Sequence, residues 1–100
     1  MTISDLRLTL RLTVEDYDAE LQALADSALA DLAMAGITSA STTLASLTDP
    51  AVSQAVKTYV RMNFGSPDDY DRLEKSYAIQ KGQLMHATGH TDWGNGGDEA

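Results

Sequence analysis

Two histidines near residue 90 have the spacing of metal ligands. His86 and His90 are four residues apart and Asp92 follows, so a continuous helix would place both imidazoles on one face. Thr88, Gly89 and several later glycines interrupt such a helix, and a metal site without rigid supporting residues binds weakly. We therefore interpret the histidines as solvated side chains and expect neither a metal nor a cofactor.

Paired carboxylates are the second candidate for chemistry. Asp68 and Asp69 are adjacent, and Asp16 lies four residues before Glu20. General acid–base catalysis needs a pocket that shifts the pKa of such groups, and the sequence defines no pocket. The pair that follows Pro67 is better explained by the dipole of a helix start, which favours acidic side chains. Without a phosphate loop, a nucleophile motif or a cysteine, the chain is not expected to be an enzyme.

The side chains named so far are positioned by elements that we predict to be helices. The stretch Thr13-Val14-Glu15-Asp16 resembles a capping box, and apolar residues then recur every three or four positions as far as Gly36. This pattern predicts a helix over about 14–35 that ends at the glycine. Its predicted inner face consists of Tyr17, Leu21, Leu24, Ala28, Leu32 and Ala35.

Two later helices are predicted to begin at a capping residue followed by proline. Asp49-Pro50 begins a helix predicted to end at Gly65, and Ser66-Pro67 begins one predicted to run to about residue 85. The predicted inner faces are Val52, Ala55, Val56, Tyr59, Val60 and Phe64 in the first helix, and Tyr70, Leu73, Tyr77 and Leu84 in the second.

The segment DLRLTLRLT, residues 5–13, has leucine at every second position, which is typical of a strand. No other segment alternates over a comparable length, and a lone strand leaves its backbone groups unpaired. A helix capped by Thr2 or Ser4 instead places Leu6 and Leu10 on one face, so we favour the helix. Its arginines share another face, and two leucines fall partly off the core. These four side chains are predicted to contact a neighbouring subunit: Arg7, Arg11, Leu8 and Leu12.

The predicted fold is all-α, a small bundle of about four helices formed by residues 1–85. A long loop, residues 37–48, follows the second helix, and residues 86–100 form a flexible, Gly-rich, acidic tail. A chain of 100 residues buries only about two-thirds of its unfolded surface, so oligomerisation is expected. Leu44 and Leu47 in the loop and Trp93 in the tail are the predicted docking residues for a partner.

The composition excludes several classes of protein. The formal net charge is −8, and residues 15–36 contain acidic side chains but no lysine or arginine, whereas binding to nucleic acid requires cations that displace counterions. The alternative of a small helix-turn-helix regulator stays open because the link between the last two predicted helices is short. The segment MTISDLRLTL has no long apolar run, so we expect no membrane partner. The absence of cysteine suits a reducing compartment, so we expect assembly in the cytosol.

Residues 49–84, DPAVSQAVKTYVRMNFGSPDDYDRLEKSYAIQKGQL, resemble the small all-helical head-tail connector proteins of tailed bacteriophages, also called adaptor or DNA-packaging proteins. The telling features are the Asp49-Pro50 helix start, the Asn63-Phe64-Gly65 end and the acidic turn that follows. The resemblance covers about residues 2–85, including TISDLRLTLRLT, whose place in the family favours a helix. The tail segment GHTDWGNGGDEA matches no pattern of the family.

This resemblance implies a structural virion protein at the head–tail interface, without catalytic activity. It implies a homo-oligomeric ring, a dodecamer, that sits beneath the portal protein and extends the DNA channel toward a downstream tail or head-closure protein. DNA would pass through this channel without sequence-specific binding. The family's contact regions correspond here to residues 37–48 and 86–100.

Overall fold

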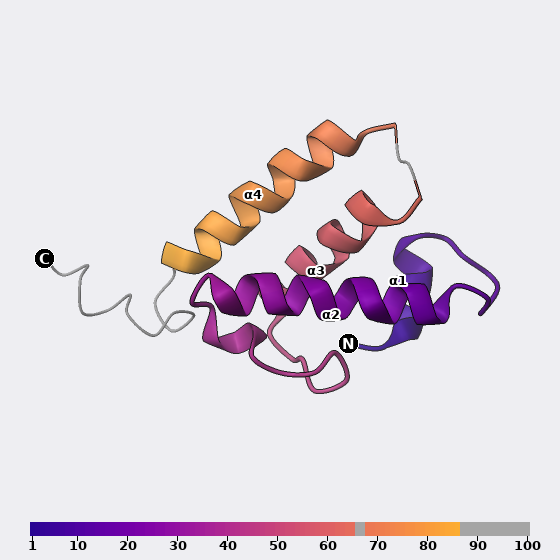
Figure 1. Ribbon diagram of the computed structural model, residues 1–100, viewed down its shortest axis with the longest axis horizontal. Helices are drawn as coiled ribbons and strands as arrows, with labels where there is room; N and C mark the ends of the chain where they lie inside the picture. The colour runs from indigo at the N-terminus through magenta and orange to yellow at the C-terminus, as the bar shows by residue number, and fades with distance from the viewer. Residues whose placement is uncertain (66–67, 87–100) are drawn as a thin grey trace, which may run out of the picture.

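The structure is a computed structural model, and it describes residues 1–65 and 68–86 (Figure 1). This part of the chain contains four α-helices, one short 3-10 helix and no strand, which confirms the prediction of a small all-α bundle. The predicted tail lies outside the described residues except for His86. In chain order the elements are α1 (Ile3–Thr9), α2 (Asp18–Met34), η1 (Thr38–Ala40), α3 (Pro50–Asn63) and α4 (Tyr70–His86).

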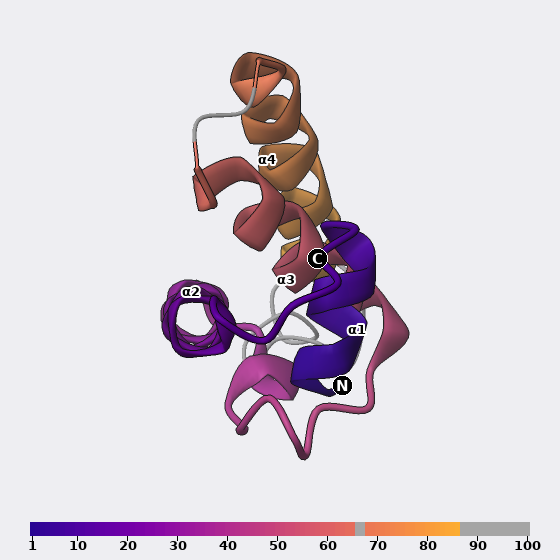
Figure 2. The same ribbon diagram turned by 90° about the vertical axis from the view of Figure 1, so that its right-hand side faces the viewer.

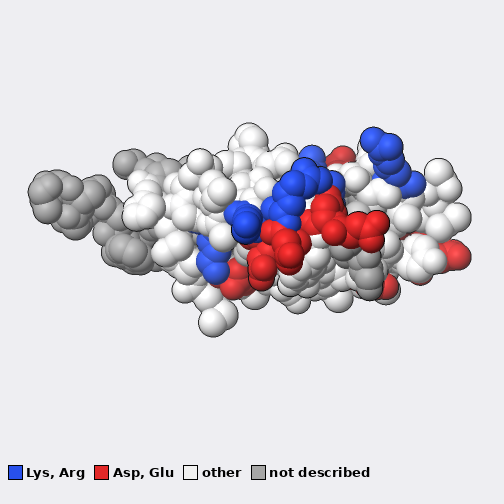
Figure 3. All heavy atoms as spheres, turned by 90° about the horizontal axis from the view of Figure 1, so that it is seen from above, with Lys and Arg blue, Asp and Glu red and all other residues white. Residues whose placement is uncertain are grey.

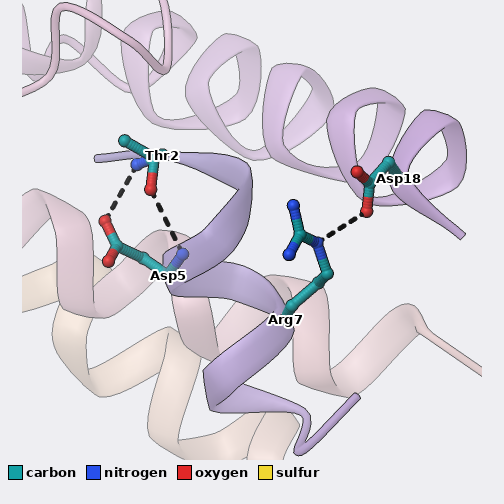
Figure 4. Close-up of polar contacts among 4 residues, drawn as sticks. All are labelled: Thr2, Asp5, Arg7 and Asp18. Atoms are coloured by element: carbon teal, nitrogen blue, oxygen red, sulfur yellow. Dashed lines mark hydrogen bonds and ion pairs between the residues drawn. The ribbon is translucent and has the colours of Figure 1, made fainter. Parts of the chain in front are cut away.

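The segment of alternating leucines forms a helix, as predicted, and Thr2 caps it. The Asp5 N–H donates to the Thr2 hydroxyl at 3.3 Å, and the Thr2 N–H donates to the Asp5 carboxylate at 2.9 Å (Figure 4). This reciprocal pair satisfies N–H groups that the first turn of a helix leaves free. The hydrogen bond from the Thr2 backbone holds the pKa of Asp5 below its ordinary value.

The first helix ends before Arg11, and this corrects one prediction. Arg11 has a φ of 59°, and the Leu12 N–H donates to the Arg7 carbonyl at 2.8 Å. This left-handed turn closes α1 at Thr9 and carries the chain away from the helix axis. Arg7 and Arg11 therefore do not share a helical face.

The second helix begins at Asp18, four residues later than predicted. Its N-cap is Tyr17 and not Thr13, and it is preceded by a turn in which the Asp18 N–H donates to the Glu15 carbonyl at 3.1 Å. Two contacts with other elements fix the start of α2. Arg7 of α1 forms an ion pair with Asp18 at 2.9 Å, and the Tyr17 ring packs edge-on against the Phe64 ring with 5.5 Å between centroids. At the other end, a glycine with a φ of 93° follows α2 as predicted.

The inner face of α2 was predicted correctly in part. Leu21, Ala28 and Leu32 are fully buried, and Leu24 is partly buried against the core. Tyr17, in contrast, is 45% exposed because it precedes the helix and only its ring edge meets α3.

The third helix lies between α2 and α4, which pack against it from different sides (Figures 1 and 2). Asp49 caps α3 as predicted, since its carboxylate accepts from the N–H groups of Ala51 at 2.9 Å and Val52 at 3.3 Å. Gly65, with a φ of 69°, follows its C-terminal end. The predicted apolar face is buried at Val52, Ala55, Val56 and Val60, and partly buried at Tyr59 and Phe64.

The long loop between α2 and α3 is part of the core. Ile37, Ala40, Leu44 and Leu47 are all buried, and η1 forms one turn within the loop. The ammonium group of Met1 donates to the Leu47 carbonyl at 2.9 Å, so the start of the chain also holds this loop.

The fourth helix buries three of its four predicted inner residues, Leu73, Tyr77 and Leu84. Tyr70 is instead 40% exposed, because it lies at the end of α4 that is farthest from α2 (Figures 1 and 2). The predicted helix start at Ser66-Pro67 lies outside the described residues. No helix within the described ranges is long and apolar enough to cross a membrane.

Candidate functional surfaces

A half-buried polar cluster joins α2 to α4. The Tyr77 hydroxyl donates to the Asp31 carboxylate at 2.6 Å, and the Lys81 ammonium donates to the same oxygen at 3.1 Å. Tyr77 and Lys81 are four residues apart on α4, so they reach Asp31 from one side of that helix. The Tyr77 ring also packs edge-on against Tyr59, with 5.3 Å between centroids.

The pKa shifts in this cluster show which of its groups are ionised. Burial alone would raise the pKa of the Asp31 carboxyl, but hydrogen bonds from Tyr77 and Lys81 outweigh burial and lower that pKa below 3.8. Burial, together with the bond to Asp31, raises the pKa of the Tyr77 hydroxyl. At neutral pH the cluster is thus a carboxylate with two donors, an arrangement that ties two helices together.

No candidate metal site is formed by the described part of the chain, where no group of three His, Cys, Asp or Glu side chains converges. His86 is the last residue of α4 and its side chain is exposed. His90 and Asp92, the other two members of the spacing considered above, lie outside the described residues.

The four side chains predicted to contact a neighbouring subunit have different environments. The Arg7 Nε donates to the Asp18 carboxylate of its own chain (Figure 4), and Leu12 is partly buried against the core. Leu8 is 75% exposed, and Arg11 is exposed and forms no ion pair with any described residue. Leu8 and Arg11 are therefore accessible to a partner, whereas Arg7 is already engaged.

A groove of about 440 Å³ lies next to Arg11. Arg11 and Arg61 both line it, and Phe64 and Leu73 give it apolar walls. Asp69 also lines it, and its carboxylate is paired with Arg72. Arg61, like Arg11, is exposed and has no ionic partner among residues 1–65 and 68–86. We call Arg11 and Arg61, together with the exposed Leu8 three residues before Arg11 in the chain, the basic surface.

The side of α2 that faces away from the core carries exposed apolar residues next to two carboxylates. Alanines spaced four and seven residues apart follow one side of the helix, and Met34 continues that side with 88% of its area exposed. Glu20 and Asp26 flank these residues, and α2 contains no lysine or arginine. We call the following residues the outer face of α2: Ala19, Glu20, Ala23, Asp26, Ala30 and Met34.

A second groove adjoins the outer face of α2 at Asp26 and Ala30. It has a volume of about 330 Å³ and lies between α2 and the loop that follows η1. Asp26, Ala30 and Ala33 line it from the helix, and Ala40 and Thr42 line it from the loop. Small side chains and one carboxylate thus form a recess beside an exposed helix.

The predicted docking residues in the loop have little exposed area. Leu44 and Leu47 are each 3% exposed, since their side chains complete the core beneath the loop. Trp93 lies outside the described residues. A docking role for these three residues stays a prediction.

Charges on the α4 side of the molecule are mixed. Figure 3 shows Lys and Arg side chains next to Asp and Glu side chains on this face, and Arg72 forms an ion pair with Asp69 at the start of α4. In a helix-turn-helix protein the start of the second helix meets DNA, where these acidic groups would repel phosphate. The residues 64–69 that join α3 to α4 also form a longer link than that motif uses.

Sequence reasoning missed three features of these surfaces. Asp31 and Lys81 were not recognised as partners, because only the packing of α4 near the end of α2 brings them together. Arg61 was not grouped with Arg11, since they are far apart in the chain. The alanines of α2 could have been found from their helical spacing, which places apolar residues on a second side of that helix.

Ionic groups tie α1 to α2 and α2 to α4 in this small helical bundle. The family model described as phage connector protein matches residues 3–91. The chain belongs to this family, which confirms the resemblance described above. No curated protein and no solved structure shows a significant match.

Membership in the family defines the general role of the protein. It is a structural head–tail connector of a bacteriophage and a component of the virion, where it interacts with other proteins of the head or tail.

Proposed function

We propose that this connector forms a closed ring beneath the portal protein, extends the DNA channel and links the filled head to the tail. The proposed ring is a homo-oligomer, a dodecamer, whose downstream partner is a tail or head-closure protein. The observation that supports this proposal is a set of large apolar side chains exposed on three helices of a connector chain. Leu8, Met34 and Ile79 are 75%, 88% and 61% exposed.

Exposed apolar residues on several sides suit a protein with several neighbours. Single exposed apolar residues are common on monomers, but these three are large and lie on three different helices, so covering all of them takes more than one neighbour. In a ring each copy would contact two other copies, the portal protein on one side and the tail on the other. Leu8 and Arg11 are proposed contacts between subunits, and the contact regions 37–48 and 86–100 stay proposed docking regions.

The negative charge of the chain supports the proposed channel. DNA that slides through a channel must not be held at its phosphates, and a net charge of −8 gives repulsion in place of binding. The chain is proposed to act without catalysis and without a cofactor, and to assemble in the host cytoplasm before it becomes part of the virion.

The experiment is co-sedimentation of the purified chain with the purified portal oligomer of the same phage. We expect the chain to move with the portal in a fixed ratio of subunits, with a control sample of portal mixed with an unrelated acidic helical protein. A chain that sediments as a monomer at every concentration, with and without portal, would contradict the proposal. A gel-shift assay at low salt separates the helix-turn-helix alternative, which requires a retarded DNA band.

A further inference from the structure

We infer that the outer face of α2 on one copy receives the basic surface of the next copy, so that Leu8, Arg11 and Arg61 lie against Ala23, Asp26 and Ala30. This inference rests on the proposed ring and names the two surfaces that meet in it.

The first argument is that α2 has apolar residues on both sides. Its inner side is buried in the core, and its outer side carries exposed alanines and Met34. Exposed apolar side chains that adjoin one another mark surfaces that contact a partner. Within the described residues nothing covers this outer side, and the groove next to it leaves room for side chains of a partner.

The second argument is charge complementarity. Glu20 and Asp26 flank the outer face of α2, and neither forms an ion pair within the described ranges. Arg11 and Arg61 are equally without ionic partners in the same part of the chain. Two accessible cations on one surface thus match two accessible carboxylates on the other, which favours association and fixes its direction.

The third argument is that the basic surface also carries an apolar side chain. Leu8 is two residues from Leu6, which is fully buried, so the two leucines lie on nearly opposite sides of α1. Leu8 therefore points away from the core and is 75% exposed. The recess beside Asp26 and Ala30 is lined by small side chains that a leucine can contact.

The positions of α1 and α2 decide the symmetry of the contact. In Figure 2, α2 lies at the left of the molecule and α1 to its right, and the basic surface shares no residue with the outer face of α2. The inferred contact therefore joins two different surfaces. Such a contact is heterologous and repeats from copy to copy, which closes into a ring when the rotation allows it. A two-fold contact would instead require one surface to complement itself.

The acidic tail is the competing occupant of the basic surface. It carries Asp92, Asp98 and Glu99 without a lysine or arginine. We assign the basic surface to α2 because α2 adds an apolar face and a groove that match Leu8. Removal of residues 87–100 distinguishes the two occupants: assembly persists if α2 is the partner and is lost if the tail is.

The test exchanges charges between the two surfaces of the full chain. Arg11→Glu places two acidic surfaces against each other, and Asp26→Arg places two basic ones. Each variant alone should self-associate at least about tenfold more weakly, because like charges across an interface are repulsive. An equal mixture of the two variants should assemble again. In an alternating ring, the surface changed by Arg11→Glu meets the surface changed by Asp26→Arg, and the two unchanged surfaces meet each other. Sedimentation velocity, with and without portal, measures the strength of self-association of each variant and of the mixture.

Matched controls use exposed charges of α4. Lys75→Glu and Glu74→Arg repeat the two charge changes away from both surfaces, and assembly should remain as in the wild type. If the wild type assembles and the exchanges at Arg11 and Asp26 have no effect, the inferred contact is wrong while the proposed ring stands. If the wild type never assembles, even with portal, the proposed function fails first.

A second test does not depend on charge. The chain has no cysteine, so a Leu8→Cys and Ala23→Cys double variant can form disulfides only at these positions. Under mild oxidation this variant should give a ladder of covalent multimers, whereas each single variant stops at dimers. The control pair Leu8→Cys with Ala78→Cys should give no ladder. Equal ladders from both pairs, or no ladder from an assembled sample of the first, would overturn the inference.

Discussion

The polar cluster between α2 and α4 gives a quantitative prediction for stability. Tyr77→Phe removes the hydroxyl that donates to Asp31 and leaves the ring that packs against Tyr59. A hydrogen bond to a charged group contributes about 1.5–3 kcal/mol when it is well buried. The Asp31 side chain is 40% exposed, so water screens the interaction and we expect a coupling of about 1 kcal/mol.

The coupling is measured with a double-mutant cycle. Wild type, Tyr77→Phe, Asp31→Ala and the double variant are unfolded in urea and followed by circular dichroism, which gives four free energies of unfolding. The protein concentration must be low enough to exclude self-association, because a partner stabilises the folded chain. Tyr59→Phe is the control, since no hydrogen bond joins its hydroxyl to Asp31.

The pH dependence of this coupling follows from the lowered pKa of Asp31. A carboxyl whose pKa is lowered in the folded chain stabilises that chain most fully at pH values above its unfolded pKa. The contribution is lost as the pH falls through the lower, folded pKa, because the protonated carboxyl binds the donors weakly. A coupling below about 0.3 kcal/mol at pH 7, or one that does not decrease when the Asp31 carboxyl is protonated at acidic pH, would refute this reasoning.

Three further predictions concern backbone conformation, capping and surface exposure. Gly65→Ala should destabilise the chain by about 1 kcal/mol because of the positive φ, whereas Gly82→Ala, within α4, should stabilise it by about 0.5–1 kcal/mol; urea unfolding measures both signs. Asp49→Ala should cost about 1 kcal/mol in the same assay, since it removes the cap of α3. Leu8→Ser should change the free energy of unfolding by less than about 0.5 kcal/mol yet weaken assembly, as measured by sedimentation.

Distinct outcomes would contradict these three predictions. Equal effects of the two glycine variants would show that backbone conformation does not decide their sign. An unchanged stability of the Asp49 variant would mean that water replaces the cap. A Leu8 variant that unfolds would place that side chain in the core of the chain.

The features that could be predicted from the sequence are those set by neighbouring residues. Asp49-Pro50 combines a side-chain cap with a residue that cannot donate, so the start of α3 was correct. The buried face of α3 followed from spacing alone. The start of α2 was wrong, because the Arg7–Asp18 ion pair and the Tyr17–Phe64 contact depend on how distant elements pack.

The candidate surfaces were predictable to a smaller extent. The exposure of Leu8 followed from its position opposite Leu6 on a helix. The partner of Arg7 could not be predicted, since its ion pair requires α1 to lie across the start of α2. The burial of Leu44 and Leu47 could not be predicted either, because a loop without periodicity does not show which side faces the core.

The central claim is that copies of this connector surround a channel at the portal. Negative-stain electron microscopy of the purified chain mixed with its portal oligomer tests that claim most directly. We expect an additional ring of density with a central opening on one end of each portal particle, and end views with cyclic symmetry. Portal particles that look the same with and without the chain, while the chain remains monomeric in solution, would contradict the claim.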